Sequence, residues 1–347
     1  MLFQDVRIAA SAYELPGQVV TSAELEERLA PTYRRLGLSS GRLELMTGIR
    51  ERRFWPQETR PSQAAAAAGE TALQASGLDR AQIGSLIHAS VCRDYLEPAT
   101  ASLVHHRLGL REECMAWDLS NACLGFVNAM AAVGAMIERG SIRAALVVAA
   151  EDGRPLVEAT IEALNARVES AKRDLKLAFA SLTIGSGAAA AVLTSSELAP
   201  EAPRLIAATS GAATRHHVLC HGDHASGHRG PLMTTDSEAM LHAGNELLER
   251  TWARFLAEVG WRVADVDRVV THQVGVQHRR LVLSTLGIPL ERDFPTVETC
   301  GNVGSVSLPL TFTRAREAGF LAPGQRVALL GIGSGLQCQI LGVEIPA

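Results

Sequence analysis

The chain has 347 residues, of which 47% are hydrophobic and 20% charged, so it can bury one large core or two of medium size. Its 33 basic and 37 acidic residues give a net charge of −4 without a long block of like charge. This balance argues against nucleic acid or an anionic membrane as an electrostatic partner and favours small-molecule ligands. The longest apolar run, Ala144–Ala150, is far shorter than the roughly 20 residues that span a bilayer.

The N-terminal segment and the cysteines both predict a cytoplasmic protein. The segment MLFQDVRIAA contains Asp5 and Arg7 where a secretory signal needs a basic start and then an apolar stretch. The six cysteines form no C-x-x-C pair, and a cytoplasmic chain does not normally pair them in disulfides. A cysteine with a function should therefore act alone.

Apolar runs of strand length alternate with helical patterns along the chain, which is typical of an α/β protein with buried sheets. A T-x-x-E capping box from Thr21 to Glu24 predicts the first helix, and Ser62 begins the second. Further helices are predicted near 99–107, from Cys123 to Glu138 with a stop at Gly140, and over about 160–176. The predicted strands are 85–91, 115–119, 144–150, 188–193 and 268–274.

The order of elements in the second part of the chain repeats that of the first. The matching segments are 85–91 and 268–274, 121–123 and 300–302, and the Ile-Gly-Ser-Gly runs at 184–187 and 332–335. The repeat predicts an N-terminal half over 1–200, with a helical insertion at about 154–180, and a C-terminal half over 201–347. Coincidence in a glycine- and alanine-rich sequence is the alternative.

Cys123 lies where a predicted strand ends and a helix begins. Unpaired backbone N–H groups and the positive end of the helix dipole should face its sulfur and lower the pKa of the thiol. A thiolate in such a turn is a nucleophile, and the same N–H groups could hold the oxyanion that forms when it attacks a thioester. The alternative is a buried cysteine that only fills space.

His272 and Asn302 strengthen the catalytic interpretation of Cys123. His272 ends the strand 268–274, and Asn302 lies in a Gly-Asn-Val-Gly loop from which a helix starts. If a pseudo-twofold axis relates the two halves, all three residues meet in one crevice. An imidazole and an amide could together polarise a thioester oxygen and so stabilise an enolate. For Asn302 alone, an ordinary helix cap is the alternative.

Five motifs together resemble the β-ketoacyl synthase III branch of the thiolase superfamily over essentially the whole chain. They are TGIRERRF at 47–54, SNACLGF at 120–126, THQV at 271–274, GNVGSVSLP at 301–309 and GIGSGL at 331–336. The resemblance implies the thiolase fold, an α/β architecture of duplicated βαβαβαββ halves in five α-β-α-β-α layers. It also implies a homodimer, a pantetheine tunnel, coenzyme A thioesters as substrates and no further cofactor.

The same resemblance implies a role for each site residue. Cys123 is the acylated nucleophile, and His272 and Asn302 line the second oxyanion site. A backbone N–H of the loop 333–335, which we assign to Ser334, joins that of Cys123 in the first oxyanion site. One departure is Cys300, which stands where the relatives of the olefin type are expected to have histidine.

Within this branch, the segment SVCRDYLEPATASLV at 90–104 is the most informative. A synthase that uses a malonyl extender obtains its carbanion by decarboxylation, whereas one that joins two intact acyl thioesters must remove an α-proton. Glu97 resembles the glutamate that acyl-CoA condensing thiolases of head-to-head olefin biosynthesis send across the dimer interface as this base. The alternative is an exposed loop carboxylate beside Pro98.

The predicted function is therefore a non-decarboxylative Claisen condensation of two fatty acyl-CoA molecules. The product is a 2-alkyl-3-ketoacyl-CoA or, after hydrolysis, a 3-keto acid, and downstream pathway enzymes are candidate partners. A decarboxylative synthase with a malonyl extender is the enzyme alternative. A non-catalytic partner subunit is the other alternative, although such proteins usually lose the nucleophile.

Two further patterns suggest other ligands less well. The segment 216–228 is rich in histidine, but its spacing fits no standard zinc site. The glycine-rich run 331–335 precedes a strand and not a helix, which argues against a dinucleotide site. Arg93 and Asp94 are expected to be structural or surface residues, whereas Arg50 could lie near the mouth that receives coenzyme A phosphates.

Overall fold

The structure is a computed structural model that describes residues 1–167, 172–224 and 230–347. Its main sheet has nine strands in the order β11-β12-β13-β8-β1-β7-β6-β4-β5. In chain order, five of these strands precede residue 200 and four follow it. They are β1 (Val6–Glu14), β4 (Ser85–His88), β5 (Met115–Asp118), β6 (Ala144–Glu151), β7 (Gly187–Ser195), β8 (Arg204–Ala212), β11 (Arg268–Thr271), β12 (Arg326–Gly333) and β13 (Gln337–Glu344).

Strand directions repeat between the two parts of this sheet. β4 runs parallel to β6, as β11 does to β12, and β7 lies antiparallel between β6 and β1, as β13 does between β12 and β8. β1 and β8 share one paired position in the described chain, Arg7 with Arg204. The counterpart of β5 is reduced to one parallel bridge, Val269 with Asp293. The predicted division into halves at 200 and 201 stays a prediction.

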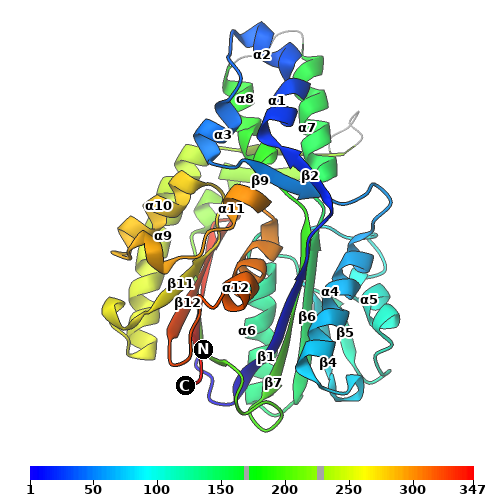
Figure 1. Cartoon of the computed structure of the whole chain (residues 1–347), viewed down its shortest axis with the longest axis vertical. Helices are drawn as coiled ribbons and strands as arrows, with labels where there is room; N and C mark the ends of the chain where they lie inside the picture. The colour runs from blue at the N-terminus through cyan, green and yellow to red at the C-terminus, as the bar shows by residue number, and fades with distance from the viewer. Residues whose placement is uncertain (168–171, 225–229) are drawn as a thin grey trace.

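Helices cover both parts of the sheet and also separate them (Figure 1). The outer helices are α4 (Pro61–Ser76) and α5 (Thr100–Leu108) on one side and α9 (Ser237–Val259) and α10 (Val276–Thr285) on the other. The central helices are α6 (Gly125–Glu138) and α12 (Ser307–Glu317). The result is the predicted stack of five α-β-α-β-α layers.

A smaller group of elements covers one end of these layers, at the top of Figure 1. It comprises β2 (Gln18–Thr21), α1 (Ser22–Arg28), α2 (Ala30–Leu36), α3 (Arg42–Thr47), β3 (Glu51–Phe54), α7 (Arg154–Ala166), α8 (Lys172–Ala178), β9 (Cys220–His224) and β10 (Pro231–Thr235). α7 and α8 lie in the connection between β6 and β7, whereas a short turn joins β12 to β13. None of the described helices has the length and apolarity needed to cross a membrane.

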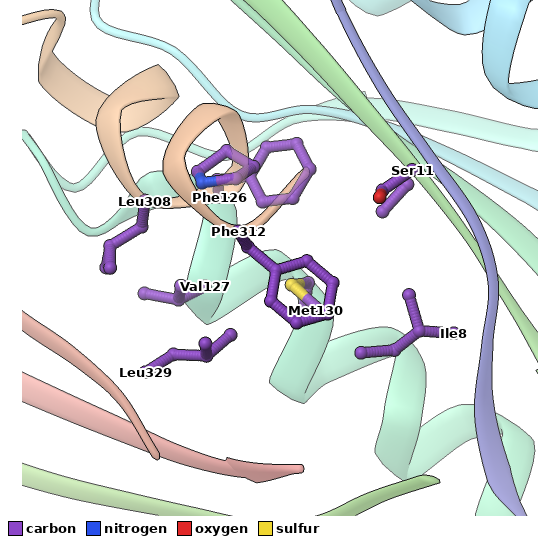
Figure 2. A pocket seen from close by; sticks show the side chains of 10 residues that line it. Ile8, Ser11, Phe126, Val127, Met130, Leu308, Phe312 and Leu329 are labelled. Atoms are coloured by element: carbon purple, nitrogen blue, oxygen red, sulfur yellow. The ribbon is translucent and has the colours of Figure 1, made fainter. Parts of the chain in front are cut away.

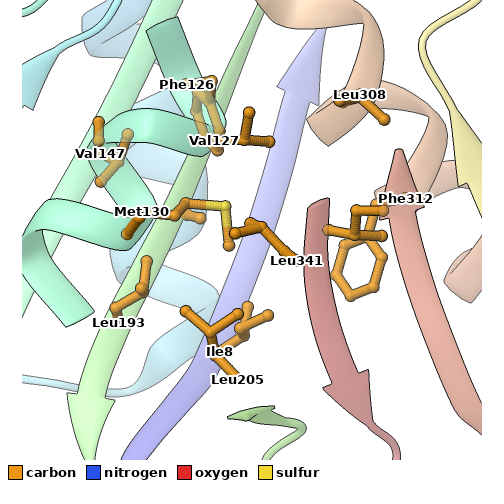
Figure 3. Packing of buried hydrophobic residues seen from close by; sticks show 14 of the residues in the cluster. Ile8, Phe126, Val127, Met130, Val147, Leu193, Leu205, Leu308, Phe312 and Leu341 are labelled. Atoms are coloured by element: carbon orange, nitrogen blue, oxygen red, sulfur yellow. The ribbon is translucent and has the colours of Figure 1, made fainter. Parts of the chain in front are cut away.

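The largest core cluster surrounds the central helices. Phe126, Val127 and Met130 of α6 and Leu308 and Phe312 of α12 are buried between the inner faces of the sheet (Figure 3). Helix α6 is therefore apolar on nearly all sides, as expected for a helix between two sheets. This packing fixes the N-terminal ends of α6 and α12, where the candidate site lies.

Most predicted elements agree with the structure within a few residues. Thr21 and Glu24 form the predicted capping box of α1. The predicted strand 85–91 is too long, because β4 ends at His88 and the N–H groups of Val91 and Cys92 bind the Glu151 carboxylate. The predicted helix 160–176 begins earlier, at Arg154, and residues 168–171 lie outside the described chain.

Candidate active site

Cys123 and Asn302 occupy matching places before the two central helices. Cys123 lies between β5 and α6, and Asn302 lies just before the short helix η6 (Gly304–Val306) that leads into α12. His272 follows β11, and its N–H donates to the carbonyl of Leu330 on β12, 2.8 Å away. Cys123 and Asn302 thus precede helices, as the sequence analysis predicted. The predicted strand 268–274 is too long, because β11 ends at Thr271 and His272 lies just beyond it.

A network of side-chain amides holds the turn that bears Cys123. Asn121 donates to Asn128 of α6 at 2.6 Å and accepts from Gln337 of β13 at 3.1 Å. Asn128 in turn donates to Gln339, at 3.0 Å. The sequence analysis missed these residues, although two glutamines on alternate positions of an otherwise apolar strand were a signal that they share one face.

The backbone before Cys123 adopts a conformation that non-glycine residues rarely occupy. Ala122 has φ of +46°, in the left-handed region. Such residues persist where the surroundings fix the backbone, and they cluster at functional sites. Here the amide network supplies that constraint.

The expected low pKa of the Cys123 thiol is wrong for the protein without substrate. Burial raises the pKa of Cys123 to about 12, and the nearby Glu151 and Cys220 raise it further, whereas the Cys123 backbone N–H opposes the shift. Loss of hydration therefore outweighs the helix N-terminus that the prediction relied on. Cys123 is a protonated thiol at neutral pH.

The loop after β12 lies against the backbone of Cys123. A Cβ atom added to Gly333 would be 3.7 Å from the Cys123 nitrogen and 3.1 Å from the Leu124 side chain. A larger residue at position 333 would therefore crowd the Leu124 side chain. Ser334 follows directly in this loop, and its role as the backbone donor stays a prediction.

His272 is a buried imidazole with unused hydrogen-bonding capacity. Its side chain is 3% exposed, and neither ring nitrogen has a partner in the described structure. Burial lowers the pKa of His272 to about 3, with a smaller contribution from His278. The ring is therefore neutral at physiological pH, with one nitrogen donating and the other accepting.

The residue after His272 anchors this position. Gln273 donates to the Phe294 carbonyl at 2.7 Å, and its side-chain oxygen accepts from the N–H groups of Thr296 and Val297 at 3.1 and 3.2 Å. These bonds connect the end of β11 to the start of α11 (Val297–Cys300). The first residue of α11, Val297, lies five residues before Asn302 in the chain. The histidine and asparagine segments are thus held together.

The side-chain oxygen of Asn302 is hydrogen-bonded within the described chain, whereas its NH₂ group is not. Its side-chain oxygen accepts from the Gly304 N–H at 3.0 Å, a turn contact beside the short helix η6, of which Val303 is the N-cap residue. Its backbone bonds on both sides to the segment before β7, donating to the Thr183 carbonyl and accepting from the Gly185 N–H, each at 2.9 Å. The side-chain NH₂ has no partner in the described chain and remains available to a ligand.

The Cys300 thiol faces helix α12. It is buried and accepts from the Arg314 guanidinium at 3.5 Å, with Thr299 at 3.8 Å. This unusual residue before Gly-Asn is therefore part of the packing behind the Asn302 loop.

Glu97 lies on an exposed loop, here called the 91–98 loop. It precedes a cis peptide bond to Pro98, and no hydrogen bond or ion pair to Glu97 exists within the described chain. Its neighbour Leu96 is 96% exposed, and Val91 is 56% exposed. Asp94, in contrast, binds the N–H and hydroxyl of Ser62 at 2.8 and 2.7 Å, which is the structural role expected for it.

The remaining candidates from the sequence are Arg50, Arg93, the histidine-rich segment and the glycine-rich run. Arg50 is an exposed side chain with Glu298 3.9 Å away, and Arg93 is also exposed. No group of three metal-ligating side chains exists among the residues that the structure describes, and His228 of the histidine-rich segment lies outside them. The glycine-rich run 331–335 ends β12 and turns into strand β13.

A small cavity of about 10 Å³ lies between the central helices (Figure 2). Phe126, Val127 and Met130 of α6 line it together with Leu308 and Phe312 of α12. It has room for about one water molecule and its lining is apolar, so it is a packing defect and not a binding site for an acyl chain.

Comparison with known proteins identifies the class to which this fold and site belong. Residues 117–213 match the family model of 3-oxoacyl-[acyl-carrier-protein] synthase III, and residues 256–345 match that of its C-terminal region. The chain is 42% identical to the acyl-CoA:acyl-CoA alkyltransferase of Shewanella oneidensis, with 99% of this chain and 100% of the relative covered. It is 39% identical to the enzyme of the same name from Xanthomonas campestris, with 99% of each covered.

Solved structures agree with this result. The structure of Xanthomonas campestris OleA with bound cerulenin matches 99% of this chain and 98% of that chain, with a TM-score of 0.94 and 39% identity. An OleA variant with bound lauric acid and lauroyl-CoA matches with a TM-score of 0.93 and 38% identity, over 99% of this chain and 100% of that chain. The chain belongs to the acyl-CoA:acyl-CoA alkyltransferase (OleA) family within the β-ketoacyl synthase III-like thiolases, which confirms the predicted fold and family.

Proposed function

We propose that this protein joins two fatty acyl-CoA molecules by a non-decarboxylative Claisen condensation at Cys123, His272 and Asn302. Membership in the family makes it an acyltransferase that condenses acyl-CoA substrates. The observation that best supports the residue roles is His272, because two buried ring nitrogens without a partner are costly unless a ligand satisfies them.

In the first half-reaction, the Cys123 sulfur forms a thioester with the acyl carbon, and the bond from that carbon to coenzyme A sulfur breaks. The thiol proton leaves with the coenzyme A. Because the pKa of Cys123 is raised to about 12, the proton must move as the sulfur attacks. The N–H groups of Cys123 and Ser334 hold the oxyanion of the intermediate.

In the second half-reaction, the carbonyl oxygen of another acyl-CoA accepts hydrogen bonds from His272 and from the Asn302 NH₂. Glu97 of the partner subunit removes the α-proton, and the enolate carbon attacks the acyl-cysteine, which releases the sulfur. A neutral imidazole suits this role, because it donates a hydrogen bond without transferring its proton. The product is a 2-alkyl-3-ketoacyl-CoA, and its hydrolysis gives the 3-keto acid.

Two features support the homodimer that this mechanism requires. β5 is an end strand of the sheet, so one row of its backbone groups is unpaired in the monomer. The 91–98 loop exposes Leu96 and Val91, apolar side chains that a partner would bury.

The proposed location is the cytoplasm. The six free cysteines fit its reducing conditions, and downstream pathway enzymes would take the product there.

Incubation with lauroyl-CoA alone tests the proposal. We expect mass spectrometry to detect the condensed product without any malonyl-CoA, and an acyl adduct on Cys123 that is absent in Cys123→Ser. With substrate deuterated at the α-carbon, the product should lose one deuterium. Condensation that required malonyl-CoA and released carbon dioxide would instead support the decarboxylative alternative.

A further inference from the structure

Glu151, at the end of β6, is a buried carboxylate that the proposed mechanism does not use. Its side chain accepts hydrogen bonds from two backbone N–H groups and from side-chain groups. One oxygen binds the Val91 N–H at 3.1 Å and the Ser305 hydroxyl at 2.6 Å, and the other binds the Cys92 N–H at 3.1 Å. A residue only 6% exposed thus binds the backbone of one distant segment, at Val91 and Cys92, and a side-chain hydroxyl of another, at Ser305.

The three donors belong to two loops with proposed roles in condensation. Val91 and Cys92 begin the 91–98 loop, which bears Glu97. Ser305 lies in η6, directly after Gly304, whose N–H donates to the Asn302 side chain. A Cβ atom added to Gly304 would lie 3.3 Å from a Glu151 carboxylate oxygen, so the Asn302 loop packs directly on this carboxylate.

The far end of the 91–98 loop is also anchored, whereas its tip is not. Asp118 accepts from the N–H groups of Thr100 and Ala101, at 2.9 and 2.8 Å, where α5 begins. Between these anchors Leu96 and Glu97 protrude. The loop is also held at Asp94, which binds the Ser62 N–H and hydroxyl. The direction in which Glu97 projects therefore depends on all of these anchors, of which Glu151 holds the beginning of the loop.

We infer that Glu151 is a positioning residue that fixes the 91–98 loop for delivery of Glu97 to the partner subunit's active site. Through Ser305 it also connects that loop to the Asn302 loop of its own subunit. The inference rests on the proposed transfer of Glu97 across the dimer interface. It assigns to Glu151 an effect on the partner's condensation step. This effect is separate from the one that the Glu151 charge has on the Cys123 thiol of its own subunit.

Glu151→Gln is the informative change. An amide replaces one acceptor oxygen by an NH₂ group, so the N–H of Val91 or of Cys92 loses its acceptor whichever way the amide turns. A buried N–H without an acceptor is destabilising, so the change should loosen the start of the loop. Glu151→Asp keeps both oxygens one methylene shorter and should retain part of the anchoring.

Hybrid dimers separate the loop from the nucleophile. A Cys123→Ala subunit and a Glu97→Gln subunit are co-expressed with different affinity tags, so that the purified hybrid has one complete site. In that site the first subunit supplies Glu97 and the second supplies Cys123. Glu151→Gln is then introduced into either subunit, and both the acyl adduct from lauroyl-CoA and the condensed product are measured.

With Glu151→Gln in the subunit that supplies Glu97, condensation should fall about tenfold, the effect expected from one lost buried acceptor. Acylation of Cys123 in the other subunit should not change. The same substitution in the subunit that supplies Cys123 should have a smaller effect on condensation. There it removes a charge that raises the pKa of Cys123, so its main effect is expected on acylation. Glu151→Asp should show the same asymmetry with a smaller loss, which gives a second measurement if the glutamine variant folds poorly.

Glu26 provides a matched control far from the 91–98 loop. It is also a buried carboxylate, and it accepts from the N–H groups of Gly41 and Leu43 and from the Tyr33 hydroxyl. Glu26→Gln should reduce stability without the difference between subunits.

Two results would overturn the inference. One is an undiminished rate with Glu151→Gln in the subunit that supplies Glu97. The other is an equal or larger loss when the change lies with Cys123. A parent hybrid that acylates but cannot condense would refute the transfer of Glu97 itself, and with it the role of Glu151, before any Glu151 variant is tested.

Discussion

Burial restricts the imidazole of His272 to a single type of chemistry. With its pKa lowered to about 3, the ring gains a proton only in strong acid and cannot serve as a general acid near neutral pH. It can still donate one N–H bond, which gains strength in a site from which water is excluded. The Asn302 NH₂ is the second neutral donor, so we expect the two to act together on one oxygen.

His272→Ala and Asn302→Ala should each slow condensation by about 10²–10³-fold, the typical effect of one lost oxyanion donor. In the unsubstituted protein, the condensation rate should not change between pH 6 and pH 8 through protonation of His272. Product formation and thermal melting are measured together. A normal rate with a lower melting temperature would assign both residues to structure alone.

His88 offers a test of how burial affects stability. It ends β4 with no exposed surface, and burial lowers its pKa to about 4, an effect that Asp118 at 3.6 Å partly opposes. In the unfolded chain a histidine takes up a proton below about pH 6.5. Between these values the unfolded state binds more protons, so the contribution of His88 to stability falls as the pH falls.

His88→Leu removes this proton linkage. Relative to the unsubstituted protein, the variant should gain about 1.4 kcal/mol of unfolding free energy for each pH unit from about pH 6 to pH 5. Urea unfolding at pH 8, 6 and 5 gives the comparison, with the pH 8 value as the reference for lost packing. If the difference in unfolding free energy were constant across this range, His88 would take up a proton as readily in the folded as in the unfolded protein.

At the scale of elements, local patterns predicted the structure where local interactions determine it. The capping box at Thr21 needs only residues three apart, and α1 begins there. The predicted end of β4 was wrong, because the N–H groups of Val91 and Cys92 donate to a distant carboxylate, Glu151, and not to a neighbouring strand. The amides of Gln337 and Gln339 were missed for the same reason, since their partners lie more than 200 residues away.

The Asn302 loop is a long-range element of this kind. It pairs with the segment before β7 through a parallel bridge between Ile184 and Asn302. Gly185 faces the Cys300 carbonyl so closely that any Cβ atom would overlap its oxygen. A side chain at position 185 must therefore displace the loop that bears Asn302.

Gly185→Ala should lower unfolding free energy by about 1–3 kcal/mol, as overpacking typically does, and should slow condensation more than acylation of Cys123. Gly17→Ala is the matched control, because a Cβ atom there meets nothing within 4 Å. Denaturant unfolding and single-turnover acylation are the two measurements. Equal slowing of both half-reactions would contradict a selective effect on the Asn302 loop.

At the scale of the whole molecule, the internal repeat and the motifs predicted the layers because each half carries its own strand pattern. The Ile-Gly-Ser-Gly runs at 184–187 and 332–335 lead into β7 and β13, which occupy matching places in the sheet. The sequence did not reveal that the β5 counterpart is reduced to one bridge. Nor did it reveal that burial reverses the expected pKa shift of Cys123, because burial depends on the packing of all layers.

The free edge of β5 leads to a prediction about assembly. The N–H groups of Met115 and Leu119 donate to the carbonyls of Gly84 and His88, at 3.1 and 2.9 Å. Since successive residues of a strand alternate, the N–H of Ala116 points away from β4, toward the unpaired edge. We expect this edge to pair with the same strand of the partner, which would make the sheet continuous across the dimer.

Ala116→Pro should weaken the dimer without removing a hydrogen bond to β4. Proline removes the outward N–H, and its ring blocks the approach of another strand, whereas Met115→Pro removes a bond inside the subunit. Light scattering after size-exclusion chromatography should show monomers for Ala116→Pro. Thermal unfolding should show a lower melting temperature for Met115→Pro. Because Glu97 of the partner subunit would then be absent, the Ala116→Pro monomer should still acylate Cys123 but fail to condense. A monomer that condensed at the native rate would show that each chain supplies its own base.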